Sequence, residues 1–285
     1  MVARNLEVIE SVLRQLREAL NEVGVSSLSK ARIKIDVGLS LDAPHTIEWL
    51  RRDSNIIVFG FEPLPVCLNS VEKLFNSTND LRKLRRRFIL VPFALGEVTR
   101  QREFFECEDP GVSSFNRPKH FQVRDVIKVS SWRLEDFLSE IEMRIDANFG
   151  IVEHLKTDCQ GSDINVLRGS IPYLPRIAVI TCEADSLDYR DSHMNDVQSI
   201  RDFLTTYGFY QFNKKSRLRE TLGPRIQRSI FHRVILLVSK LSGSVKPQVS
   251  QVQVSEILEV SDPTFINKDF EEKILEGKIR AFQTH

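Results

Sequence analysis

Acidic and glycine residues stand at the ends of two short apolar runs early in this sequence. The first run, Ile33–Val37, contains Asp36 and is followed directly by Gly38, and Glu62 follows the second run, 24 residues after Gly38. A glycine at a strand end lets the backbone approach a ligand closely. An acid about 20 residues later accepts hydrogen bonds from ribose hydroxyls in nucleotide sites. These residues predict a site for an adenosine-containing ligand.

The loop after the first run distinguishes between such ligands. It passes through Leu39 and Ser40 to Asp42 and contains a single glycine, whereas a dinucleotide-binding loop has three. The carboxylate of Asp42 would repel a diphosphate but tolerate the amino-acid part of a ligand. The loop therefore favours a nucleoside with an amino-acid moiety over a dinucleotide. The alternative interpretation is an ordinary strand-to-helix turn.

The elements that must position these residues alternate in type along the chain. Continuous apolar runs predict the strands Ile33–Val37, Ile56–Phe61, Phe88–Phe93, Ile151–Lys156, Arg176–Cys182, Tyr207–Phe212 and Val234–Val238. Helical spacing and capping residues predict the helices Asp42–Arg52, Pro65–Phe75, Trp132–Glu142, Asp163–Arg168 and Val197–Thr206. Uninterrupted apolar strands are typical of parallel sheets covered on both faces. We therefore expect an α/β fold with a doubly wound sheet.

Segments outside this alternation set the domain organisation. Residues 1–30 are expected to form an amphipathic helix and a linker, 31–240 the main domain, and 241–285 an appended or partly disordered tail. Within the stretch Glu97–Ser130, the segment GEVTRQREFFECEDPGVSSF is predicted to form an antiparallel hairpin with a loop, and Val126–Val129 another short strand. The apolar stripe of the first helix is expected to cover a sheet or to support a homodimer.

Composition narrows the classes of partner and location. The chain has 285 residues with 40 basic and 39 acidic side chains, so its net charge of +1 gives no general attraction to nucleic acid or anionic lipid. No apolar run is long enough to cross a bilayer, and the acids of the N-terminal segment argue against a signal peptide. The basic run Arg82–Arg87 is interpreted as a solvent-exposed face. The sequence predicts a cytoplasmic protein that binds neither nucleic acid nor membrane.

Five pieces of the sequence, in order, resemble one enzyme family. They are IDVGLS, FGFEPLP, VPFALGE, SSF and LKTDCQGSDINVLRG, and they extend from Ile33 to about Glu183. The last piece is the most specific, with a lysine, an aspartate and a glycine at a strand end before a helix. In this set and spacing the chain resembles FkbM-type S-adenosylmethionine-dependent methyltransferases. The resemblance implies a Rossmann-like sheet, mainly parallel, with an antiparallel final strand.

The same resemblance implies roles for individual residues. The first loop, with Asp36, Gly38, Leu39, Ser40 and Asp42, and the acid Glu62 would hold the methionine and ribose parts of S-adenosylmethionine. The family's second glycine is replaced here by Asp42, which is expected to bind the α-amino group of the cofactor. The remaining cofactor contacts implied are Ala94 and Leu95 beside the adenine, Ser114 on a covering loop, and Asp158 at the methyl-transfer face.

Methyl transfer to a hydroxyl group needs an aligned acceptor and benefits from a base, and it requires no metal. The candidate catalytic residues at the predicted strand ends are Asp158, Glu183 and His193. Lys156 points to the same side of its strand as Asp158, so the two either hold the acceptor as a pair or tie neighbouring strands together. His154, inside a strand, is expected to be a packed histidine.

These inferences predict a methyltransferase that acts on a hydroxyl oxygen of a small molecule or sugar, the oxygen acceptor being implied by the family resemblance. Two alternatives stay open. One is a methyltransferase-like protein that binds the cofactor, or has lost activity, and acts through interactions. The other is an NAD(P)-dependent oxidoreductase on a similar sheet, which the missing glycines disfavour.

Overall fold

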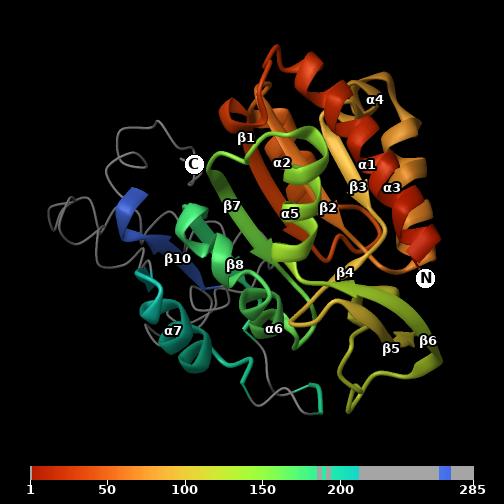
Figure 1. Ribbon diagram of the computed structural model, residues 1–285. Coiled ribbons are helices and arrows are strands. Elements are labelled where there is room, and N and C mark those ends of the chain that lie inside the picture. Colours follow the sequence, from red (N-terminus) through yellow and green to blue (C-terminus); the bar gives the residue numbers. More distant parts are fainter. Residues whose placement is uncertain (1, 185–187, 191–193, 212–262, 271–285) are drawn as a thin grey trace, which may run out of the picture.

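The computed structural model describes residues 2–184, 188–190, 194–211 and 263–270, and a seven-stranded sheet with the order β3-β2-β1-β7-β8-β10-β9 forms its centre (Figure 1). Its strands are β1 (Arg32–Val37), β2 (Ile56–Phe61), β3 (Phe88–Val91), β7 (Val152–Thr157), β8 (Val179–Cys182), β9 (Phe209–Gln211) and β10 (Thr264–Asn267). The first five pair in parallel, and β10 pairs antiparallel with β8 and β9. The predicted Rossmann-like sheet with an antiparallel final strand is confirmed.

Helices cover both faces of the sheet. On one face, α1 (Val2–Glu22), α5 (Leu134–Ile145), α6 (Asp163–Arg168) and α7 (Val197–Thr206) share one apolar core. On the other face, α2 (Pro44–Arg52), α3 (Pro65–Ser77) and α4 (Asn79–Arg85) form a second core over β1 to β3. The sequence predicted α6 and α7 with their observed bounds, and it missed α4.

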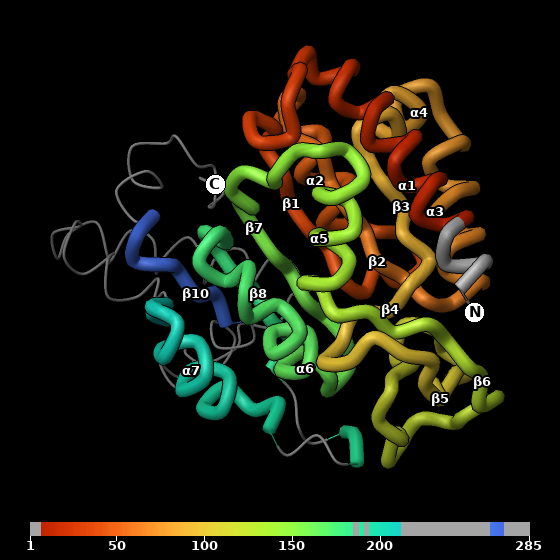
Figure 2. The backbone as a smooth tube through the Cα atoms, in the orientation of Figure 1, coloured from red at the N-terminus to blue at the C-terminus, as the bar shows by residue number. Residues whose placement is uncertain are grey.

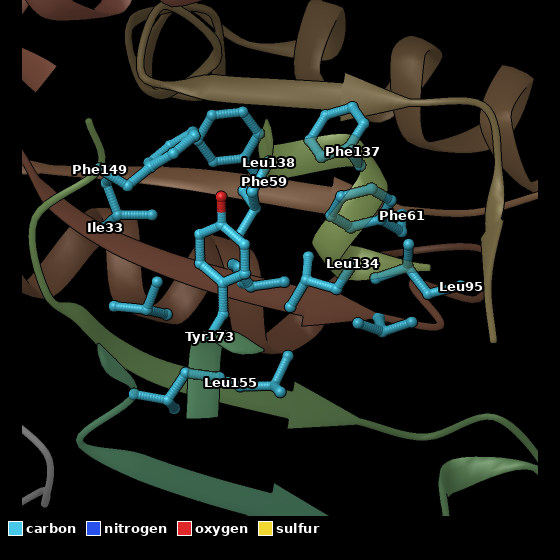
Figure 3. Close-up of a cluster of buried hydrophobic side chains, with 14 of the residues drawn as sticks. Ile33, Phe59, Phe61, Leu95, Leu134, Phe137, Leu138, Phe149, Leu155 and Tyr173 are labelled. Atoms are coloured by element: carbon cyan, nitrogen blue, oxygen red, sulfur yellow. The ribbon is translucent and has the colours of Figure 1, made fainter. Parts of the chain in front are cut away.

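The strands alternate their side chains between the two cores. In β2, Phe59 and Phe61 face α5, where both rings meet Phe137 edge-on with centroids 6.1 and 5.0 Å apart (Figure 3). Phe149 meets Phe59 in the same way at 5.9 Å. Edge-on aromatic pairs of this kind each add about 0.5–1.5 kcal/mol beyond the burial of their area. This packing fixes β1, β2 and β7 relative to one another, and their ends carry the candidate site.

The apolar stripe of α1 is buried inside the protein. Its side chains Ile9, Val12, Leu13 and Leu16 are at most 2% exposed and belong to the core that also contains α5. Figure 2 shows α1 lying beside α5 and β3. The stripe therefore covers the sheet, and this surface is not available for the homodimer that the sequence suggested.

A second, three-stranded sheet with the order β4-β6-β5 lies next to the carboxyl ends of the large sheet's strands (Figure 1). Its strands are β4 (Ala94–Leu95), β5 (Arg100–Cys107) and β6 (Val123–Trp132), and β5 and β6 pair antiparallel. A hairpin was predicted here, but within residues 96–115; its second strand is instead β6, which contains the separately predicted strand Val126–Val129. The loop between its strands contains a short 3₁₀ turn, Pro110–Val112, and leads back over the end of the large sheet.

Strand β10 comes from the segment 241–285, which the sequence analysis expected to be an appended tail. Phe265 and Ile266 are each 1% exposed and pair with Ile180 and Val179 of β8. Four residues were too short an apolar run to be recognised as a strand. The predicted strand Val234–Val238 lies outside the described residues, as does the rest of that segment apart from residues 263–270.

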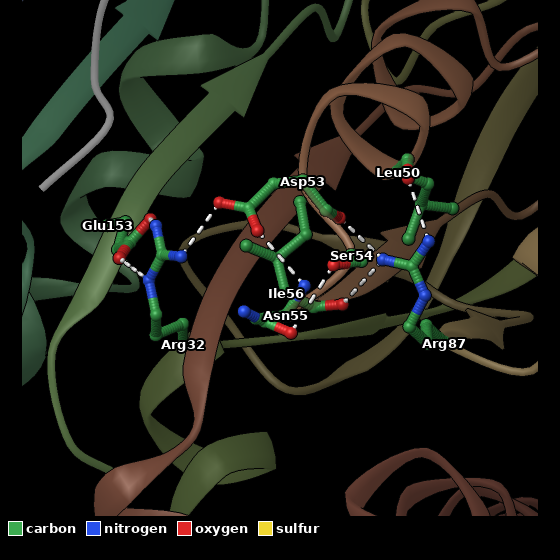
Figure 4. A network of polar contacts seen from close by, with 8 residues as sticks. All are labelled: Arg32, Leu50, Asp53, Ser54, Asn55, Ile56, Arg87 and Glu153. Atoms are coloured by element: carbon green, nitrogen blue, oxygen red, sulfur yellow. Dashed lines mark hydrogen bonds and ion pairs between the residues drawn. The ribbon is translucent and has the colours of Figure 1, made fainter. Parts of the chain in front are cut away.

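Four charged side chains join the amino-terminal ends of the central strands: Arg32, Asp53, Arg87 and Glu153 (Figure 4). We call this region the amino edge. The guanidinium of Arg32 donates to Glu153 at 2.6 and 3.0 Å and to Asp53 at 2.7 Å. Arg87 is 7% exposed and donates to the carbonyl oxygens of Leu50 and Asp53 at the end of α2. The interpretation of the basic run as solvent-exposed is therefore wrong at Arg87, because that side chain caps a helix.

Among the described residues, no helix is both long and apolar enough to cross a membrane.

Candidate functional site

A cavity opens at the carboxyl-terminal ends of β1, β2, β4 and β7, which we call the carboxyl edge. It is lined by residues of the first loop, of the strand ends and of the hairpin, including Gly38, Ser40, Glu62, Leu64, Ala94, Leu95, Phe104, Gly111, Phe115, Asp158, Cys159 and Gln160. Strand order reverses between β1 and β7 beside this cavity. That position is where open α/β sheets bind ligands.

Gly38 is required by the backbone geometry of the first loop. Its φ is +80°, and a Cβ atom there would lie 2.0 Å from the carbonyl oxygen of Asp158. The N–H of Gly38 donates to the carbonyl of Phe61 at 3.0 Å, so the loop is fixed to β2 as well. Ser40 also has a positive φ, of 55°. The loop is therefore wedged between the ends of β2 and β7, with Ser40 at the cavity.

Glu62 lies against the same loop. Its carboxylate accepts a hydrogen bond from the N–H of Leu64 at 2.9 Å and further hydrogen bonds from the backbone N–H groups of Leu39 and Ser40. Burial raises the pKa of Glu62 to about 7, although these three donors act in the opposite direction. The loop beginning at Asp36 and the Glu62 carboxylate thus meet at one cavity, as the sequence analysis expected.

Lys156 of β7 sits between two carboxylates. Its Nζ lies 3.6 Å from Oδ1 of Asp36 and 3.3 Å from Oδ2 of Asp158, and it donates to the carbonyl of Gly38 at 3.2 Å. Asp36 is 1% exposed and also accepts from the hydroxyl of Thr46 at 2.7 Å. Asp36 therefore holds Lys156, which in turn holds Asp158, so Lys156 ties the end of β7 to β1, which is one of the two roles considered for it.

Asp158 is the carboxylate of this group that reaches the cavity. Burial would raise its pKa, but the charge of Lys156 and hydrogen bonds from Glu183 and Gln160 lower it. The side-chain amide of Gln160 donates to Asp158 at 2.8 Å and to Glu183 at 3.0 Å. The structure thus brings together two of the three candidate catalytic residues. The third, His193, lies outside the described residues.

The hairpin loop closes one side of the cavity. The hydroxyl of Ser114 donates to the carbonyl of Gln160 at 2.7 Å, and Asn116 donates to the carbonyl of Gly161 at 2.7 Å. Ser114 is 1% exposed, so it fastens the covering loop to the end of β7. Phe104 and Phe115, with centroids 5.1 Å apart, present an apolar wall beside Ala94.

Leu39 and Asp42 do not face the cavity. Leu39 is 1% exposed and packs with Trp49 in the core under α2. Asp42 is exposed on the far side of the loop, and the N-cap of α2 is Ala43 with φ of 44°. The helix begins two residues later than predicted, and this turn carries the Asp42 carboxylate away from the ligand side. At Leu39 only the backbone, through its N–H, reaches the site.

His154 is a packed histidine, as expected. Its ring lies 5.0 Å from that of Trp49, and its Nε2 is 3.0 Å from the hydroxyl of Thr181. Burial lowers its pKa well below the ordinary value, so the ring is neutral at pH 7. It stands on β7 two positions before Lys156 and outside the cavity lining.

Sequence reasoning missed the parts played by Gln160 and Tyr189. Gln160 has φ of 52°, and Gly161 follows with φ of 82°. The hydroxyl of Tyr189 lies 2.6 Å from Oε1 of Gln160. A glycine shortly after a strand, such as Gly161 after β7, is a signal for a turn, whereas nothing local to Tyr189 indicates that it returns to this loop.

Comparison with known proteins gives the chain's relationships. A family model described as the methyltransferase FkbM domain matches residues 36–210, which is more than half of the chain. No curated protein matches it. Among solved structures, methyltransferase FkbM from Methylobacillus flagellatus KT is 12% identical with a TM-score of 0.41, over 74% of this chain and 55% of that one. The chain thus spans little more than half the length of that protein.

Two further solved structures are of human METTL16. Its N-terminal domain in complex with SAH is 11% identical with a TM-score of 0.36, over 70% of this chain and 64% of that one. Its catalytic domain in complex with the MAT2A 3′UTR hairpin 1 is 16% identical with a TM-score of 0.32, over 72% and 65%.

Proposed function

This chain belongs to the FkbM family of methyltransferase domains, and we propose that it transfers a methyl group from S-adenosylmethionine to a hydroxyl oxygen of a small molecule or sugar. One observation carries the proposal. The first loop donates the N–H groups of Leu39 and Ser40 to the carboxylate of Glu62, at a cavity that Asp158 also lines. The first loop and Glu62, which would bind the nucleoside, therefore share one cavity with Asp158, the candidate residue at the methyl-transfer face.

The residues at the cavity fit an adenosyl ligand. Glu62 is positioned to accept hydrogen bonds from ribose hydroxyls, and Gly38 lines the cavity with backbone atoms alone. Ala94, Leu64 and Phe115 offer an apolar surface for a base. S-adenosylmethionine supplies a methyl group already activated by its sulfonium, so the protein must orient the acceptor and exclude water.

A hydroxyl acceptor also needs a proton acceptor, and Asp158 fits that role. Its side chain is 34% exposed while its partner Lys156 is 5% exposed, so the carboxylate faces the open side of the group. The lysine keeps Asp158 ionised at pH 7. Since Lys156 is itself held by Asp36, the carboxylate is oriented before an acceptor arrives.

Calorimetry with S-adenosylhomocysteine tests the cofactor site. We expect the wild-type protein to bind it and Glu62→Gln to bind about tenfold more weakly, because the charged acceptor of a hydrogen bond is lost. Glu153→Gln makes the same substitution in the buried network at the amino edge and should bind like wild type. Absence of heat with wild-type protein at millimolar ligand would refute the proposed cofactor, and unchanged binding by Glu62→Gln would refute the ribose contact.

The acceptor class needs its own experiment. Transfer of a labelled methyl group should be detected on hydroxylated small molecules or sugars and be absent from an RNA hairpin offered at the same concentration. Label recovered on the RNA alone would overturn the proposed acceptor while leaving the cofactor assignment intact.

A further inference from the structure

We propose that Gln160 is a positioning residue that joins Asp158 and Glu183 into one acid–base unit with a single negative charge, and that Tyr189 fixes the orientation of its amide. The inference rests on the proposed function, since it assigns the proton acceptor of the same site. It concerns two residues, Gln160 and Tyr189, to which the sequence pattern assigned no role.

The geometry of Gln160 identifies which end of its amide faces the carboxylates. Carboxylate oxygens accept hydrogen bonds, so the atom lying 2.8 Å from Asp158 and 3.0 Å from Glu183 must be the donor, Nε2. The opposite end, Oε1, accepts from the hydroxyl of Tyr189 at 2.6 Å. A side-chain amide offers both the donor and the acceptor that this arrangement uses.

The backbone of Gln160 is held as firmly as its side chain. Its carbonyl accepts from Ser114 at 2.7 Å, and its φ of 52° is outside the region that most residues adopt. Strained backbone kept in place by several contacts is common where a side chain must be aimed. Tyr189 is 2% exposed and reaches the loop from beyond β8, beside the covering hairpin loop to which its own segment is hydrogen-bonded.

Asp158 and Glu183 are close enough to share a proton. Their side chains are hydrogen-bonded to each other, besides sharing the amide of Gln160. Two adjacent carboxyl groups cannot both ionise easily, so one keeps its proton while the other is charged. Lys156, at 3.3 Å from Asp158, selects Asp158 as the charged member, and Glu183 carries the proton.

Other titratable groups around the pair act on its proton. Among the described residues these are Lys156 and Asp36 on β7 and β1, Cys159 in the loop, and Asp163 at the start of α6. Burial raises the pKa of Asp163 to about 7, and Asp158 adds to this rise. A second charge on the pair would therefore be opposed by Asp163 and stabilised only by Lys156, whose charge Asp36 already balances in part.

The unit has a defined task in the reaction. Asp158 takes the proton of the acceptor hydroxyl as the acceptor oxygen bonds to the methyl carbon, while the carbon–sulfur bond breaks and leaves its electron pair on sulfur. The pair then holds two protons and releases one of them to solvent, which restores its single negative charge. Gln160 holds the two carboxyl groups side by side throughout, because its amide can hydrogen-bond to the pair in either protonation state.

The shared proton is tested on the protein without cofactor. In protein labelled with ¹³C at glutamate side-chain carboxyl carbons, the Glu183 signal is assigned as the one missing from Glu183→Gln. We expect it to titrate above the ordinary glutamate range, and its midpoint to move by about one pH unit in Gln160→Glu, where a donor is replaced by a third carboxyl group. Tyr189→Phe should give a smaller shift in the same signal.

Matched controls separate positioning from general damage. Gln198→Glu, on exposed α7, removes an amide that donates to Asp202 at 2.7 Å, and Tyr173→Phe removes a hydroxyl bonded to Glu142 at 2.7 Å. Neither should move the Glu183 midpoint, even where Tyr173→Phe lowers the melting temperature. An ordinary Glu183 titration, or one unchanged in both Gln160→Glu and Tyr189→Phe, overturns the proposal.

A second measurement distinguishes this inference from the proposed function. The ratio of the affinities for S-adenosylmethionine and S-adenosylhomocysteine reports the charge facing the sulfonium, and loss of structure affects both ligands alike. We expect this ratio to fall on acidification in wild type and to change by about fivefold at pH 7 in Gln160→Glu. If the protein binds neither ligand, the proposed cofactor is refuted. The carboxyl titration still decides whether Asp158 and Glu183 form the proposed pair.

Discussion

The amino edge and the carboxyl edge of the same strands contain similar charged residues, but the two edges differ in how these residues are hydrogen-bonded. At the amino edge, Arg32 binds Glu153 and Asp53 through three hydrogen bonds of 2.6 to 3.0 Å (Figure 4). At the carboxyl edge, Lys156 lies 3.6 Å from Asp36, whose Oδ1 has no hydrogen-bond partner in the described part of the chain. The named contacts of the amino edge are all hydrogen bonds, whereas at the carboxyl edge one buried carboxylate oxygen has only an ion-pair contact.

Backbone strain is concentrated at the carboxyl edge. Of the four non-glycine residues with positive φ in the described part of the chain, Ser40, Ala43 and Gln160 lie in loops beside this edge, and Asp146 ends α5. Strain and raised carboxyl pKa values cost stability, and proteins tolerate them where geometry serves binding or catalysis. The difference teaches that residue type alone does not mark a site in this fold: the amino edge also gathers four charged side chains, but none of them lines the cavity described above.

The largest expected effect comes from removing the cation of the carboxyl edge. Lys156→Met leaves Asp36 and Asp158 buried without their shared partner, so we expect the free energy of unfolding to fall by about 3–5 kcal/mol and S-adenosylhomocysteine binding to be lost. Arg32→Met, at the amino edge, should lower stability without changing the affinity of the folded protein. Urea denaturation and calorimetry measure the two effects, and equal losses of affinity would remove the distinction between the edges.

Gly38→Ala tests the close approach of the first loop to β7. A methyl group there meets the Asp158 carbonyl and forces a φ of +80° on alanine, so we expect a loss of about 3 kcal/mol in the free energy of unfolding. Gly24→Ala has a similar φ of +69° with no atom within 4 Å and should cost about 1 kcal/mol. Thermal denaturation of the two variants measures both losses of stability. Similar losses would show that the positive φ alone, and not the contact with Asp158, determines the loss.

The pH dependence of stability tests Glu62. Its pKa is about 7 in the folded protein against about 4.5 unfolded, so the folded state binds more protons between these values and stability falls as pH rises through that window. Glu62→Gln removes this loss, and its stability relative to wild type should improve by about 2 kcal/mol from pH 5 to pH 8. Urea denaturation at both pH values measures this, and a constant difference would contradict it.

The smallest effect is expected where a pair near the amino edge is exposed. Arg51 and Asp80 lie 3.4 Å apart with side chains 57% and 65% exposed, so Asp80→Ala should change the free energy of unfolding by less than about 1 kcal/mol. The change should disappear in 1 M salt, where exposed charges are screened. A larger loss would mean that exposure is not what separates the weak contacts from the strong ones.

Much of the fold could be predicted from local pattern. Continuous apolar runs indicated the parallel strands, and the spacing of Gly38 and Glu62 placed both at the cavity. A local sequence pattern does not show in which direction a side chain points. Asp42 was expected at the ligand, but the turn at Ala43 carries it to the far side.

Contacts between distant segments were also beyond the sequence. Tyr189 meets Gln160 across 29 positions, and Arg87 caps a helix that ends 34 or more positions earlier. Neither residue has a neighbour pattern that indicates its partner. The candidate site was therefore predicted where it depends on strand ends, and missed where it depends on segments returning from elsewhere.

The position of β10 has a consequence for how this chain reaches its final form. Because β10 lies between β8 and β9, β9 has no hydrogen-bonded neighbour among the described strands of the sheet until Thr264–Asn267 have left the ribosome. A chain shortened to residue 240 would expose the edges of both strands, and open strand edges are templates for aggregation. Shortening the protein for crystallisation or expression should therefore retain residues 263–270, and newly synthesised chains are expected to depend on chaperones until those residues emerge.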